Sequence, residues 1–409
     1  MLTHNKNNVK RVLLTGGGTG GSVSPLLAIA EELKNTPFNK GGVGGFQFLW
    51  LGTQNGPEKE MVASASSAQA ASAVASTGVQ EGIEFKAIVS GKFRRYFSLK
   101  NFTDLFLIAI GFVQSFFIIL KWKPDLVISA GSFSSVPVVW AAWILRVPIL
   151  VHQQDVRPGL ANKLMAPFAK VITVTFEESL KDYGKKAVWI GNPSRNMEHV
   201  THNINTSGEF ERNFKNSLPL RRGGLGGVLP VVLIIGGGTG AAAINELVWK
   251  SLDELTKFCH VVHITGKDKI PPLTKGVRGI FSAGNKTEKG YQYFEFFNAE
   301  QMAESYAAAD IVVSRAGMGV LTELSYLGKP SIIIPLPDSH QEENAEIFRQ
   351  KKTAVVLNQK ELTAETFYVS IKKLLGDEKL RAELSKNIRE IIKRGANEEM
   401  VKLINNILK

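Results

Sequence analysis

The sequence predicts an α/β protein made of two doubly wound, Rossmann-like domains that face each other across a cleft. The chain has 409 residues, which is too long for one hydrophobic core when a domain takes about 100–200 residues. A short apolar run, a glycine-rich turn and a helix follow one another twice, beginning near residues 12 and 231. Strand and helix patterns alternate after each copy, and this alternation indicates a parallel sheet covered by helices.

The first half begins with residues 12–14, a short valine and leucine run that enters the glycine turn GGGTGG at 16–21. Residues 25–34 then carry apolar side chains at helical spacing. The same order of strand, turn and helix recurs along this half. The further ranges are 46–52, 125–131 with 136–145, and 147–152.

The second half repeats this order after a polar, glycine-punctuated stretch at 201–228. Residues 231–235 enter GGGTG at 236–240, and a helix follows from Ala241. Further strands are expected at 261–265, 311–313 and 331–335.

These patterns divide the chain. We expect an N-terminal domain at 1–194, a C-terminal domain at 195–380, and C-terminal helices at 381–409 that pack back on the N-terminal domain. Because sheets of this kind bind ligands beyond the carboxyl ends of their strands, we expect the site in the cleft between the domains.

The composition is that of a globular enzyme, with 44% hydrophobic and 21% charged residues. It excludes a disordered, collagen-like or solenoid chain. Cys259 is the single cysteine, which excludes an intramolecular disulfide and a multi-cysteine metal site. The apolar run near the N-terminus is too short for a secretory signal, so we expect a cytoplasmic location.

Surplus positive charge gathers beside the most apolar segment. The formal net charge is +12, and residues 86–123 contain seven bases and one acid. The apolar stretch at 105–120 falls short of the roughly 20 residues that span a bilayer. It suits either docking on an anionic membrane surface or a core helix with a solvated basic edge. The basic residues are Lys92, Arg94, Arg95, Lys121 and Lys123, and the aromatic ones are Phe93, Tyr96, Phe97, Phe102, Phe106 and Trp122.

The two glycine turns are candidate phosphate sites. A glycine turn at the start of a helix lets backbone N–H groups approach a phosphate at the positive end of the helix dipole. Each copy is equally readable as a simple tight turn. Neither ends in the Gly-Lys-Ser/Thr of a P-loop, and the strand after the first copy ends in Gly52-Thr53-Gln54 without an acid for a dinucleotide ribose.

Residues 314–345 hold the richest cluster of polar and glycine positions. Gly317 and Gly319 open a helix, and Glu323 follows one turn later, where its carboxylate can accept hydrogen bonds from a ribose diol. An acid in a first turn also offsets the helix dipole by about 0.3–1 kcal/mol, which is the alternative. His340 and Gln341 begin the next helix and can reach sugar hydroxyls or phosphate, or serve as a solvated cap.

Five segments together resemble the MurG family. They are TGGGTGGSVSPLLAIAEEL, KPDLVISAGSFSSVPVVWAAWILRVPILVHQQDVRPGLANK, GNPSR, IIGGGTGAAAIN and SRAGMGVLTELSYLGKPSIIIPLPDSHQEENA. Their order and spacing match this family of cytoplasmic N-acetylglucosaminyltransferases, which make lipid II from lipid I in peptidoglycan synthesis and so serve cell shape and division. The match is weakest at 54–84 and 196–228.

The resemblance implies a glycosyltransferase-B architecture. The C-terminal domain would bind UDP-N-acetylglucosamine, and the N-terminal domain would receive lipid I, undecaprenyl-pyrophosphoryl-N-acetylmuramyl-pentapeptide. On the donor side it implies Gly238, Thr239 and Arg195 near the diphosphate, Phe297 at the uracil, Met318, Gly319, Val320, Leu321 and Thr322 at the diphosphate, Glu323 at the ribose, and His340 and Gln341 at the sugar. On the acceptor side it implies Thr19, Gly20 and Gly21, with Asp155 where some relatives have Asn.

One departure from the family concerns the catalytic base. The family usually has His directly after GGTGG, whereas this chain has Ser22, whose hydroxyl is not a base near neutral pH. Either this position orients the acceptor or another group takes the proton. His152 and Asp155 are the nearest candidates by motif, and each is also readable as a structural residue at a strand end.

The implied reaction is an inverting displacement in which a hydroxyl of lipid I attacks the anomeric carbon of the donor. The nine Asp include no Asp-x-Asp pair, so we expect no metal and no cofactor. Expected partners are the donor, the lipid acceptor, an anionic membrane surface at the cytoplasmic face and other cell-wall synthesis proteins.

Three alternatives remain. A UDP-N-acetylglucosamine 2-epimerase shares this architecture and would not need a lipid-binding face. A nicotinamide oxidoreductase is disfavoured by the missing ribose acid. A nucleic-acid binder is disfavoured because the bases cluster around an apolar helix rather than along a groove interleaved with aromatic residues.

Overall fold

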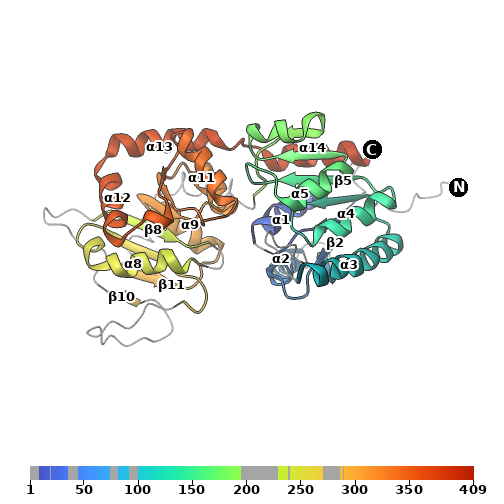
Figure 1. Ribbon diagram of the computed structural model, residues 1–409, viewed down its shortest axis with the longest axis horizontal. Helices are drawn as coiled ribbons and strands as arrows, with labels where there is room; N and C mark the ends of the chain where they lie inside the picture. Colours follow the sequence, from blue (N-terminus) through green and yellow to red (C-terminus); the bar gives the residue numbers. More distant parts are fainter. Residues whose placement is uncertain are drawn as a thin grey trace. The chain divides into compact units, whose positions relative to one another are not determined.

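The computed structural model describes residues 9–18, 20–35, 45–73, 82–91, 100–194, 229–237, 240–269, 286–288 and 290–409. The chain forms two compact units (Figure 1). Unit 1 comprises Met1–Arg195 together with Lys393–Lys409, and unit 2 comprises Asn196–Ile392.

Unit 1 contains a seven-stranded sheet in the order β3-β2-β1-β4-β5-β6-β7, in which every neighbouring pair is parallel. The strands are β1 (Lys10–Thr15), β2 (Phe46–Gly52), β3 (Glu84–Ala87), β4 (Leu126–Ser129), β5 (Ile149–Gln153), β6 (Val171–Val174) and β7 (Ala187–Trp189). The α-helices are α1 (Gly20–Asn35), α2 (Pro57–Ala73), α3 (Lys100–Trp122), α4 (Ser135–Ile144), α5 (Leu160–Met165) and α14 (Ala396–Leu408). Three 3₁₀ turns are η1 (Ala166–Phe168), η2 (Glu177–Asp182) and η3 (Gly184–Lys186).

The unit 1 sheet is buried on both faces, which explains why its strands are continuous apolar runs. Successive side chains of a strand point to opposite faces. Val12 and Leu14 therefore pack with α1, α2 and α14, whereas Leu13 packs with α3, α4 and α5. The two clusters form two cores, one on each side of the sheet.

Unit 2 contains a second seven-stranded sheet, in the order β10-β11-β9-β8-β12-β13-β14, parallel except for the β10–β11 pair. Its strands are β8 (Val231–Ile235), β9 (His260–Ile264), β10 (Lys286–Glu288), β11 (Tyr291–Phe294), β12 (Ile311–Ser314), β13 (Ser331–Ile333) and β14 (Val355–Val356). Its helices are α8 (Ala242–Leu255), α9 (Ala299–Ala308), α10 (Met318–Leu327), α11 (Gln341–Gln350), α12 (Ala364–Gly376) and α13 (Glu378–Ile391), with the 3₁₀ turn η4 (Gln359–Glu361).

Two parallel, helix-covered sheets confirm the predicted fold class of two doubly wound domains. The predicted cleft between them stays a prediction. The expected C-terminal segment 381–409 is divided by the structure: α13 packs against α10 and α12 of unit 2, whereas α14 packs against α1 of unit 1. Amphipathic periodicity predicts both helices but does not say which sheet each one covers.

In each sheet the strand order reverses next to the strand that leads into the glycine turn. In unit 1 the order reverses between β1 and β4, and in unit 2 between β8 and β12. Ligands of doubly wound sheets bind beyond the carboxyl ends of the strands at such switch points. The topology therefore brings the turn after β4 beside the first glycine turn, and the turn after β12 beside the second.

Candidate functional site

The first glycine turn is closed by a buried carboxylate from α2. Glu58 is 0% exposed. Its Oε2 accepts from the backbone N–H of Gly18 at 3.1 Å, and its Oε1 accepts from both the backbone N–H and the hydroxyl of Thr53, at 2.8 and 2.6 Å. A Cβ on Gly17 or Gly56 would collide with this carboxylate, so a side chain at either position would displace Glu58 from its present contacts. Sequence analysis did not single out Glu58, because an acid in the first turn of a helix is usually only a dipole partner.

Ser22 stabilises the same turn from inside α1. Its side chain is largely buried, and its hydroxyl donates to the backbone carbonyl of Gly17 at 2.9 Å. Gly20 and Gly21 begin α1 and are partly exposed. They offer backbone N–H groups of a helix N-terminus, the arrangement that suits a phosphate. Thr19 lies outside the described residues.

A second hydroxyl-rich turn, between β4 and α4, adjoins the first. The hydroxyl of Thr15 donates to Ser135 Oγ at 3.2 Å, which in turn donates to the carbonyl of Gly131 at 2.8 Å. Ser132 has a φ of 87°, in the left-handed region that costs a residue with a side chain energy. Its Oγ lies 2.9 Å from that of Ser134, which precedes α4. Sequence analysis missed this turn, and its SAGSFSS composition was the available signal.

His152 does not sit at the surface of the site. It is 0% exposed, with Nδ1 3.0 Å from Thr173 Oγ1 and Nε2 3.0 Å from Asn192 Oδ1. Burial lowers its pKa to about 4, although these hydrogen bonds oppose the shift. Both ring nitrogens are engaged and the neutral ring is enclosed, which supports the alternative that His152 is a structural residue; its role as a catalytic base stays a prediction.

Asp155 lies two residues after the end of β5, the strand that contains His152, and is partly exposed. Its loop is held by Gln153, whose Nε2 donates to the backbone carbonyls of Asp155 and Arg157 at 2.8 and 3.0 Å. The side-chain Oε1 of Gln153 accepts in turn from the hydroxyl of Tyr183 at 2.9 Å. Of the two residues proposed from the HQQD motif, Asp155 is the one whose position allows contact with a ligand.

The second glycine turn is closed by backbone rather than by a side-chain acid. Gly240 has a φ of 70°, and a Cβ there would collide with the carbonyl of Thr265 at the end of β9. The Nδ2 of Asn245 donates to that same carbonyl at 2.9 Å. Gly238 and Thr239, which the family resemblance places at the diphosphate, lie outside the described residues, as does Arg195.

A buried chain of hydrogen bonds holds Asn245 in this orientation. Since its Nδ2 is a donor to the backbone, its Oδ1 accepts, and His263 Nε2 lies 3.0 Å from it. His263 Nδ1 then accepts from the hydroxyl of Tyr291 at 3.1 Å, and the Tyr291 oxygen accepts from Trp249 Nε1 at 3.2 Å. Burial lowers the pKa of His263 to about 3, so the ring is neutral and the chain keeps one direction.

The turn between β12 and α10 opens a helix N-terminus to ligand. α10 begins at Met318 with Gly317 as its N-cap, and no side chain caps it. A Cβ on Gly317 or Gly319 would meet nothing within 4 Å. Packing therefore does not require glycine here, and the absence of side chains lets an anion approach the first N–H groups. Val320 is partly exposed, while Leu321 and Thr322 face the interior.

Glu323 lies in the next turn of α10, and it retains some exposure. Its Oε2 accepts a 2.6 Å hydrogen bond from the hydroxyl of Tyr306. Burial raises the pKa of the Glu323 carboxyl, and the Tyr306 hydrogen bond opposes this shift. The arrangement fits a carboxylate that accepts hydroxyl groups at a sheltered position.

The two adjacent phenylalanines before α9 have different surroundings. Phe297, expected at the uracil, is 5% exposed, and its ring packs on Phe294 with centroids 4.5 Å apart. Its ring belongs to the core, so any contact to a base would come from its backbone. Phe296 is 75% exposed and is the ring available for stacking. Sequence reasoning could not distinguish them, because neighbouring residues differ only in the direction that the fold imposes.

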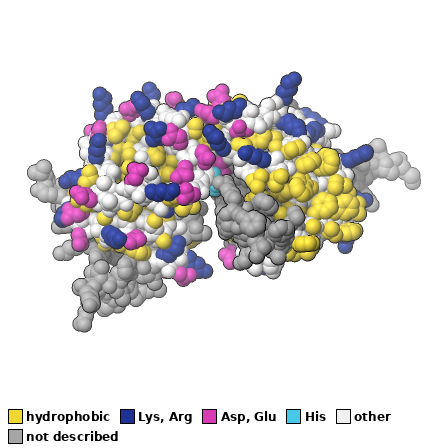
Figure 2. All heavy atoms as spheres, viewed as in Figure 1, with side chains coloured by type: hydrophobic (Ala, Val, Ile, Leu, Met, Phe, Trp, Pro, Cys, Tyr) yellow, Lys and Arg dark blue, Asp and Glu magenta, His cyan; other side chains and the backbone are white. Residues whose placement is uncertain are grey.

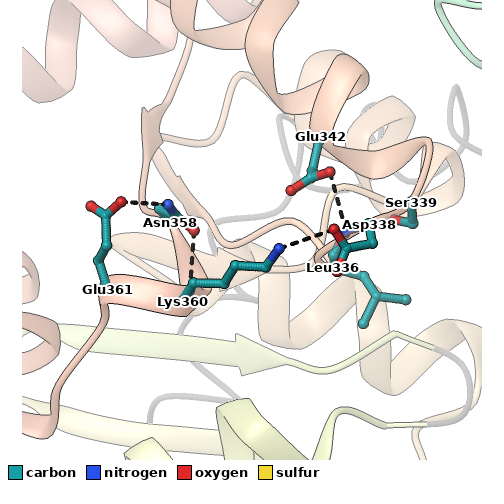
Figure 3. A network of polar contacts seen from close by, with 7 residues as sticks. All are labelled: Leu336, Asp338, Ser339, Glu342, Asn358, Lys360 and Glu361. Atoms are coloured by element: carbon teal, nitrogen blue, oxygen red, sulfur yellow. Dashed lines mark hydrogen bonds and ion pairs between the residues drawn. The ribbon is translucent and has the colours of Figure 1, made fainter.

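His340 and Gln341 lie where β13 leads into α11. His340 is exposed, and Gln341 Oε1 accepts from the backbone N–H of Leu336 at 3.0 Å. Figure 3 shows the surrounding network, in which the backbone N–H of Asp338 donates to Glu342 and the Lys360 ammonium bonds the Asp338 carboxylate at 3.0 Å. The loop before Gln341 is thus held by hydrogen bonds and an ion pair close to it, and the Oε1 of Gln341 takes part in them.

Two buried side chains tie this loop to the α10 turn. Arg315 Nη1 donates to the carbonyls of Ile334 and Pro335, both at 3.1 Å, and Asn344 Nδ2 donates to the carbonyl of Ala316 at 3.3 Å. Buried hydrogen bonds therefore connect the chain after β12 with the chain after β13. Arg315 and Asn344 were not proposed from sequence, although both lie in the window that sequence analysis selected.

Unit 1 also exposes an apolar face, which Figure 2 shows as a continuous yellow area over α3 and α4. On α3 the exposed residues recur at spacings of four and three, so they form one stripe, led by Phe106 at 72% and Phe117 at 63%. The face comprises Phe106, Ile110, Val113, Phe117 and Leu120 of α3, Trp143 and Ile144 of α4, and Leu160 and Leu164 of α5. We call this set the apolar face.

Exposed bases lie on these helices or within two residues of their ends. They are Lys121, Lys123, Arg146 and Lys163. Trp122, expected among the docking aromatics, packs instead against the core. Lys92, Phe93, Arg94, Arg95, Tyr96 and Phe97 lie outside the described residues, and nothing is described of the Phe102 side chain. Within the described ranges no helix is long and apolar enough to cross a membrane.

Two family models match the chain, one for each unit. The glycosyltransferase family 28 N-terminal domain matches residues 12–174, and the glycosyltransferase family 28 C-terminal domain matches residues 231–400. The fold and these matches define the class as two-domain glycosyltransferases of glycosyltransferase-B architecture.

Curated relatives narrow this class. The UDP-N-acetylglucosamine–N-acetylmuramyl-(pentapeptide) pyrophosphoryl-undecaprenol N-acetylglucosamine transferase of Clostridium kluyveri is 36% identical over 376 residues, 90% of this chain and 91% of that protein. Its Clostridium tetani counterpart is 34% identical and covers 88% of each chain. The chain therefore belongs to the family of these transferases, the MurG family.

Solved structures agree on the fold. Acinetobacter baumannii MurG matches with a TM-score of 0.67 at 22% identity, covering 97% of this chain and 99% of that one. The UDP-GlcNAc 2-epimerase of Neisseria meningitidis bound to UDP-GlcNAc matches with a TM-score of 0.65 at 12% identity, covering 97% and 100%. Fold alone thus does not separate a transferase from an epimerase, and the sequence relatives do.

Proposed function

We propose that this protein transfers N-acetylglucosamine from UDP-N-acetylglucosamine to undecaprenyl-pyrophosphoryl-N-acetylmuramyl-pentapeptide, forming lipid II and UDP. The observation that supports this best is the 36% identity to transferases of this name along 90% of the chain, which includes both units. In the reaction a hydroxyl of the acceptor sugar forms a bond to the anomeric carbon. The bond from that carbon to the diphosphate breaks with inversion, and the hydroxyl proton leaves to a base.

Unit 2 would bind the donor. The open N-terminus of α10 at Gly317 and Gly319 would meet the diphosphate, together with the second glycine turn. Glu323 would accept the ribose hydroxyls, Phe296 would stack on the base, and Gln341 would reach the sugar. Charge that develops on the departing diphosphate would be stabilised by helix N-termini that are already oriented before the reaction.

Unit 1 would bind the acceptor. The N-termini of α1 and α4 meet at the switch point of its sheet, and both turns present backbone N–H groups or hydroxyls suited to the acceptor diphosphate. Because the carboxylate of Glu58 already occupies the N–H of Gly18, the acceptor phosphates would use the later N–H groups, at Gly20 and Gly21.

The catalytic base would be a residue other than Ser22 and His152. The Ser22 hydroxyl is bonded to a carbonyl within its own turn, and the His152 ring is enclosed. Asp155 is the remaining residue among those named from the motifs. Transfer should persist in EDTA, because the chain has no Asp-x-Asp pair to hold a metal; loss of activity in EDTA would refute this expectation.

The apolar face would dock the enzyme on the membrane that holds its lipid acceptor. Nine large apolar side chains from three helices are exposed together, with bases at their edge. Insertion of aromatic and aliphatic side chains combined with attraction to anionic lipid gives reversible binding without a spanning segment. The enzyme would then work at the cytoplasmic face of the membrane, in reach of other cell-wall synthesis proteins.

Vesicle flotation tests the docking. Wild type should bind anionic vesicles more strongly than neutral ones, and Phe106→Ser combined with Phe117→Ser should lose most of this binding. The matched control is Phe296→Ser, which removes an equally exposed ring from unit 2. Equal loss in the control, or equal binding of wild type to both vesicle types, would contradict docking through this face.

The transfer itself is tested with radiolabelled UDP-N-acetylglucosamine and a lipid I analogue. We expect a labelled lipid product from wild type. Glu323→Ala should give about 100-fold less product, because the variant lacks the charged carboxylate that accepts the ribose hydroxyls of the UDP-sugar. Ser22→His should be measured alongside. If only that variant transfers, position 22 is the missing base and the wild-type proposal is wrong.

The epimerase alternative is favoured by one observation, the TM-score of 0.65 to an epimerase bound to UDP-GlcNAc. Incubation with the donor alone, followed by proton NMR of the sugar, separates the two functions, because epimers at C2 have the same mass but different spectra. A mannosamine-configured sugar, free or still joined to UDP, would indicate an epimerase, and an unchanged donor would agree with a transferase that lacks its acceptor.

A further inference from the structure

The carboxylate proposed to hold the donor ribose is itself held by a buried tyrosine. Tyr306 lies on α9 and is 2% exposed. Its hydroxyl donates to Oε2 of Glu323 on α10 over 2.6 Å. α9 and α10 flank β12 in the chain, so the contact joins the helix before this strand to the helix after it.

The protonation states of the two groups fix the direction of this hydrogen bond, with Tyr306 as the donor and Glu323 as the acceptor. Burial and the nearby Glu323 raise the pKa of Tyr306 well above its ordinary value, so the phenol stays protonated and donates. Burial also raises the pKa of Glu323, while the hydrogen bond from Tyr306 lowers it. The tyrosine therefore favours the ionised carboxylate, which is the form that accepts hydrogen bonds from hydroxyl groups.

The geometry leaves capacity on the carboxylate for a diol. An ionised carboxylate offers about four lone-pair sites, and the Tyr306 hydroxyl uses one of them. A glutamate side chain left alone loses rotamer freedom on binding, which weakens the complex. A partner that fixes the carboxylate beforehand removes part of this cost, as preorganisation does in other binding sites.

We propose that Tyr306 is a positioning residue that orients the Glu323 carboxylate toward both hydroxyls of the donor ribose, and that it thereby sets the preference of the enzyme for ribose over 2′-deoxyribose nucleotides. This inference rests on the proposed function, because it takes Glu323 as the ribose-binding residue. Tyr306 itself does not touch the ligand.

Calorimetric binding of UDP and 2′-deoxy-UDP to the full chain tests the inference. Tyr306→Phe removes the hydroxyl and keeps the ring. We expect it to bind UDP about tenfold more weakly, in line with loss of a hydrogen bond to a charged group, and to bind 2′-deoxy-UDP almost unchanged. In transfer assays the donor KM should rise by a similar factor while kcat stays within about twofold.

Two further variants distinguish positioning from general damage. Tyr291→Phe removes another buried phenol hydroxyl of unit 2, one bonded to His263, and should leave the ribose preference intact. Glu323→Gln, which keeps the size of the side chain, should abolish the preference, and Tyr306→Phe added to it should change nothing more. If Tyr306→Phe folds poorly, Glu323→Gln can still overturn the inference, because a ribose preference kept in that variant would mean that the carboxylate bonded by Tyr306 does not recognise the ribose.

The outcomes separate the two hypotheses. Wild type that binds neither nucleotide would overturn the proposed function. Wild type that prefers UDP, with a Tyr306→Phe variant that keeps this preference in full, would overturn the inference alone. An equal loss of preference in Tyr291→Phe would also overturn it, because the effect would then not depend on the contact to Glu323.

Discussion

The two glycine turns have nearly the same sequence, GGGTGG and GGGTGA, and follow equivalent strands, but the protein closes them differently. In unit 1 the carboxylate of Glu58 accepts the N–H of Gly18, and Ser22 bonds the carbonyl of Gly17. In unit 2 the carbonyl of Thr265 packs against Gly240 under the control of Asn245. A negative charge is therefore built into the first turn, whereas the second is closed by a neutral group.

A glycine turn is therefore not by itself a phosphate site. An N–H that already bonds a protein carboxylate cannot also bond a phosphate. The first turn can receive an anion only at its later N–H groups, while the N-terminus of α10, beside the second turn, has no side-chain cap. This difference between the two turns is consistent with the proposal that unit 1 binds the acceptor and unit 2 binds the donor.

The largest expected effect comes from breaking the unit 1 closure. Glu58→Ala leaves the N–H groups of Gly18 and Thr53 without their acceptor inside a buried region, so unfolding free energy should fall by about 3–5 kcal/mol. Urea unfolding of the variant measures this. Glu60→Ala on the exposed side of α2 is the control and should leave stability unchanged. Equal midpoints for the two variants would show that the closure contributes nothing.

The two buried histidines, one in each unit, should make the stability of the protein depend on pH. The unfolded chain protonates histidine below about pH 6.5, whereas His152 and His263 fold with pKa values of about 4 and about 3. The unfolded state binds more protons in between, so stability present at pH 7 is lost as pH falls, by about 3 kcal/mol for His152 near pH 4.

Thermal unfolding between pH 7 and pH 4.5 checks this. His152→Gln should be less stable than wild type at pH 7 but should lose stability less steeply as the pH is lowered. Val369→Ala, an exposed substitution that changes no titratable group, should keep the wild-type slope. If His152→Gln shows the wild-type slope too, the ring of His152 is protonated in the folded protein.

Two glycines of unit 2 separate folding from binding. Gly240→Ala places a side chain at a φ of 70° against the Thr265 carbonyl, and should cost about 2–3 kcal/mol of unfolding free energy. Gly319→Ala meets no neighbour and should be stable, but its methyl should weaken UDP binding several-fold. Thermal unfolding and UDP calorimetry on both variants measure the two effects. Undiminished UDP affinity in Gly319→Ala would place the diphosphate elsewhere.

The smallest effect is expected at Asp338, which is an acid like Glu58 but is exposed rather than buried. Asp338 pairs with Lys360 beside the His340 loop, and both side chains are largely exposed. Exposed pairs are screened by water, so Lys360→Met should leave the unfolding midpoint and the donor KM nearly unchanged. A clear rise in KM would mean that this pair holds the sugar-binding loop in place.

Much of the fold was predictable from sequence, because two local signals dominate it. Apolar runs entering glycine turns located β1 and β8, and helical spacing located α1 and α3. At 381–409 the structure agrees with the expectation for α14, which packs on unit 1, and differs for α13, which packs on unit 2, since an amphipathic helix shows which of its faces is buried but not against which sheet. Packing partners are a property of the whole chain.

The candidate site was predictable in part. The switch points contain the turns that sequence analysis selected, whereas Glu58, Ser132 and Tyr306 were not proposed. Their signal is weak because an acid, a serine or a tyrosine has many ordinary roles, and only spatial neighbours assign one. The uracil contact expected of Phe297 stays a prediction, and only the fold shows that Phe297, and not the adjacent Phe296, has the buried ring.

The two doubly wound domains, the glycine turns and the family are readable from the residues alone, because they depend on residue order and spacing. The enclosure of His152, the contact of Glu58 with a turn 40 residues away and the apolar face over three helices follow from tertiary packing. Burial and hydrogen-bond partners arise between residues far apart in the chain, and no local pattern encodes them. Chemistry at a site depends on exactly these quantities, because they set which groups are charged, which are free to bind and which are already engaged.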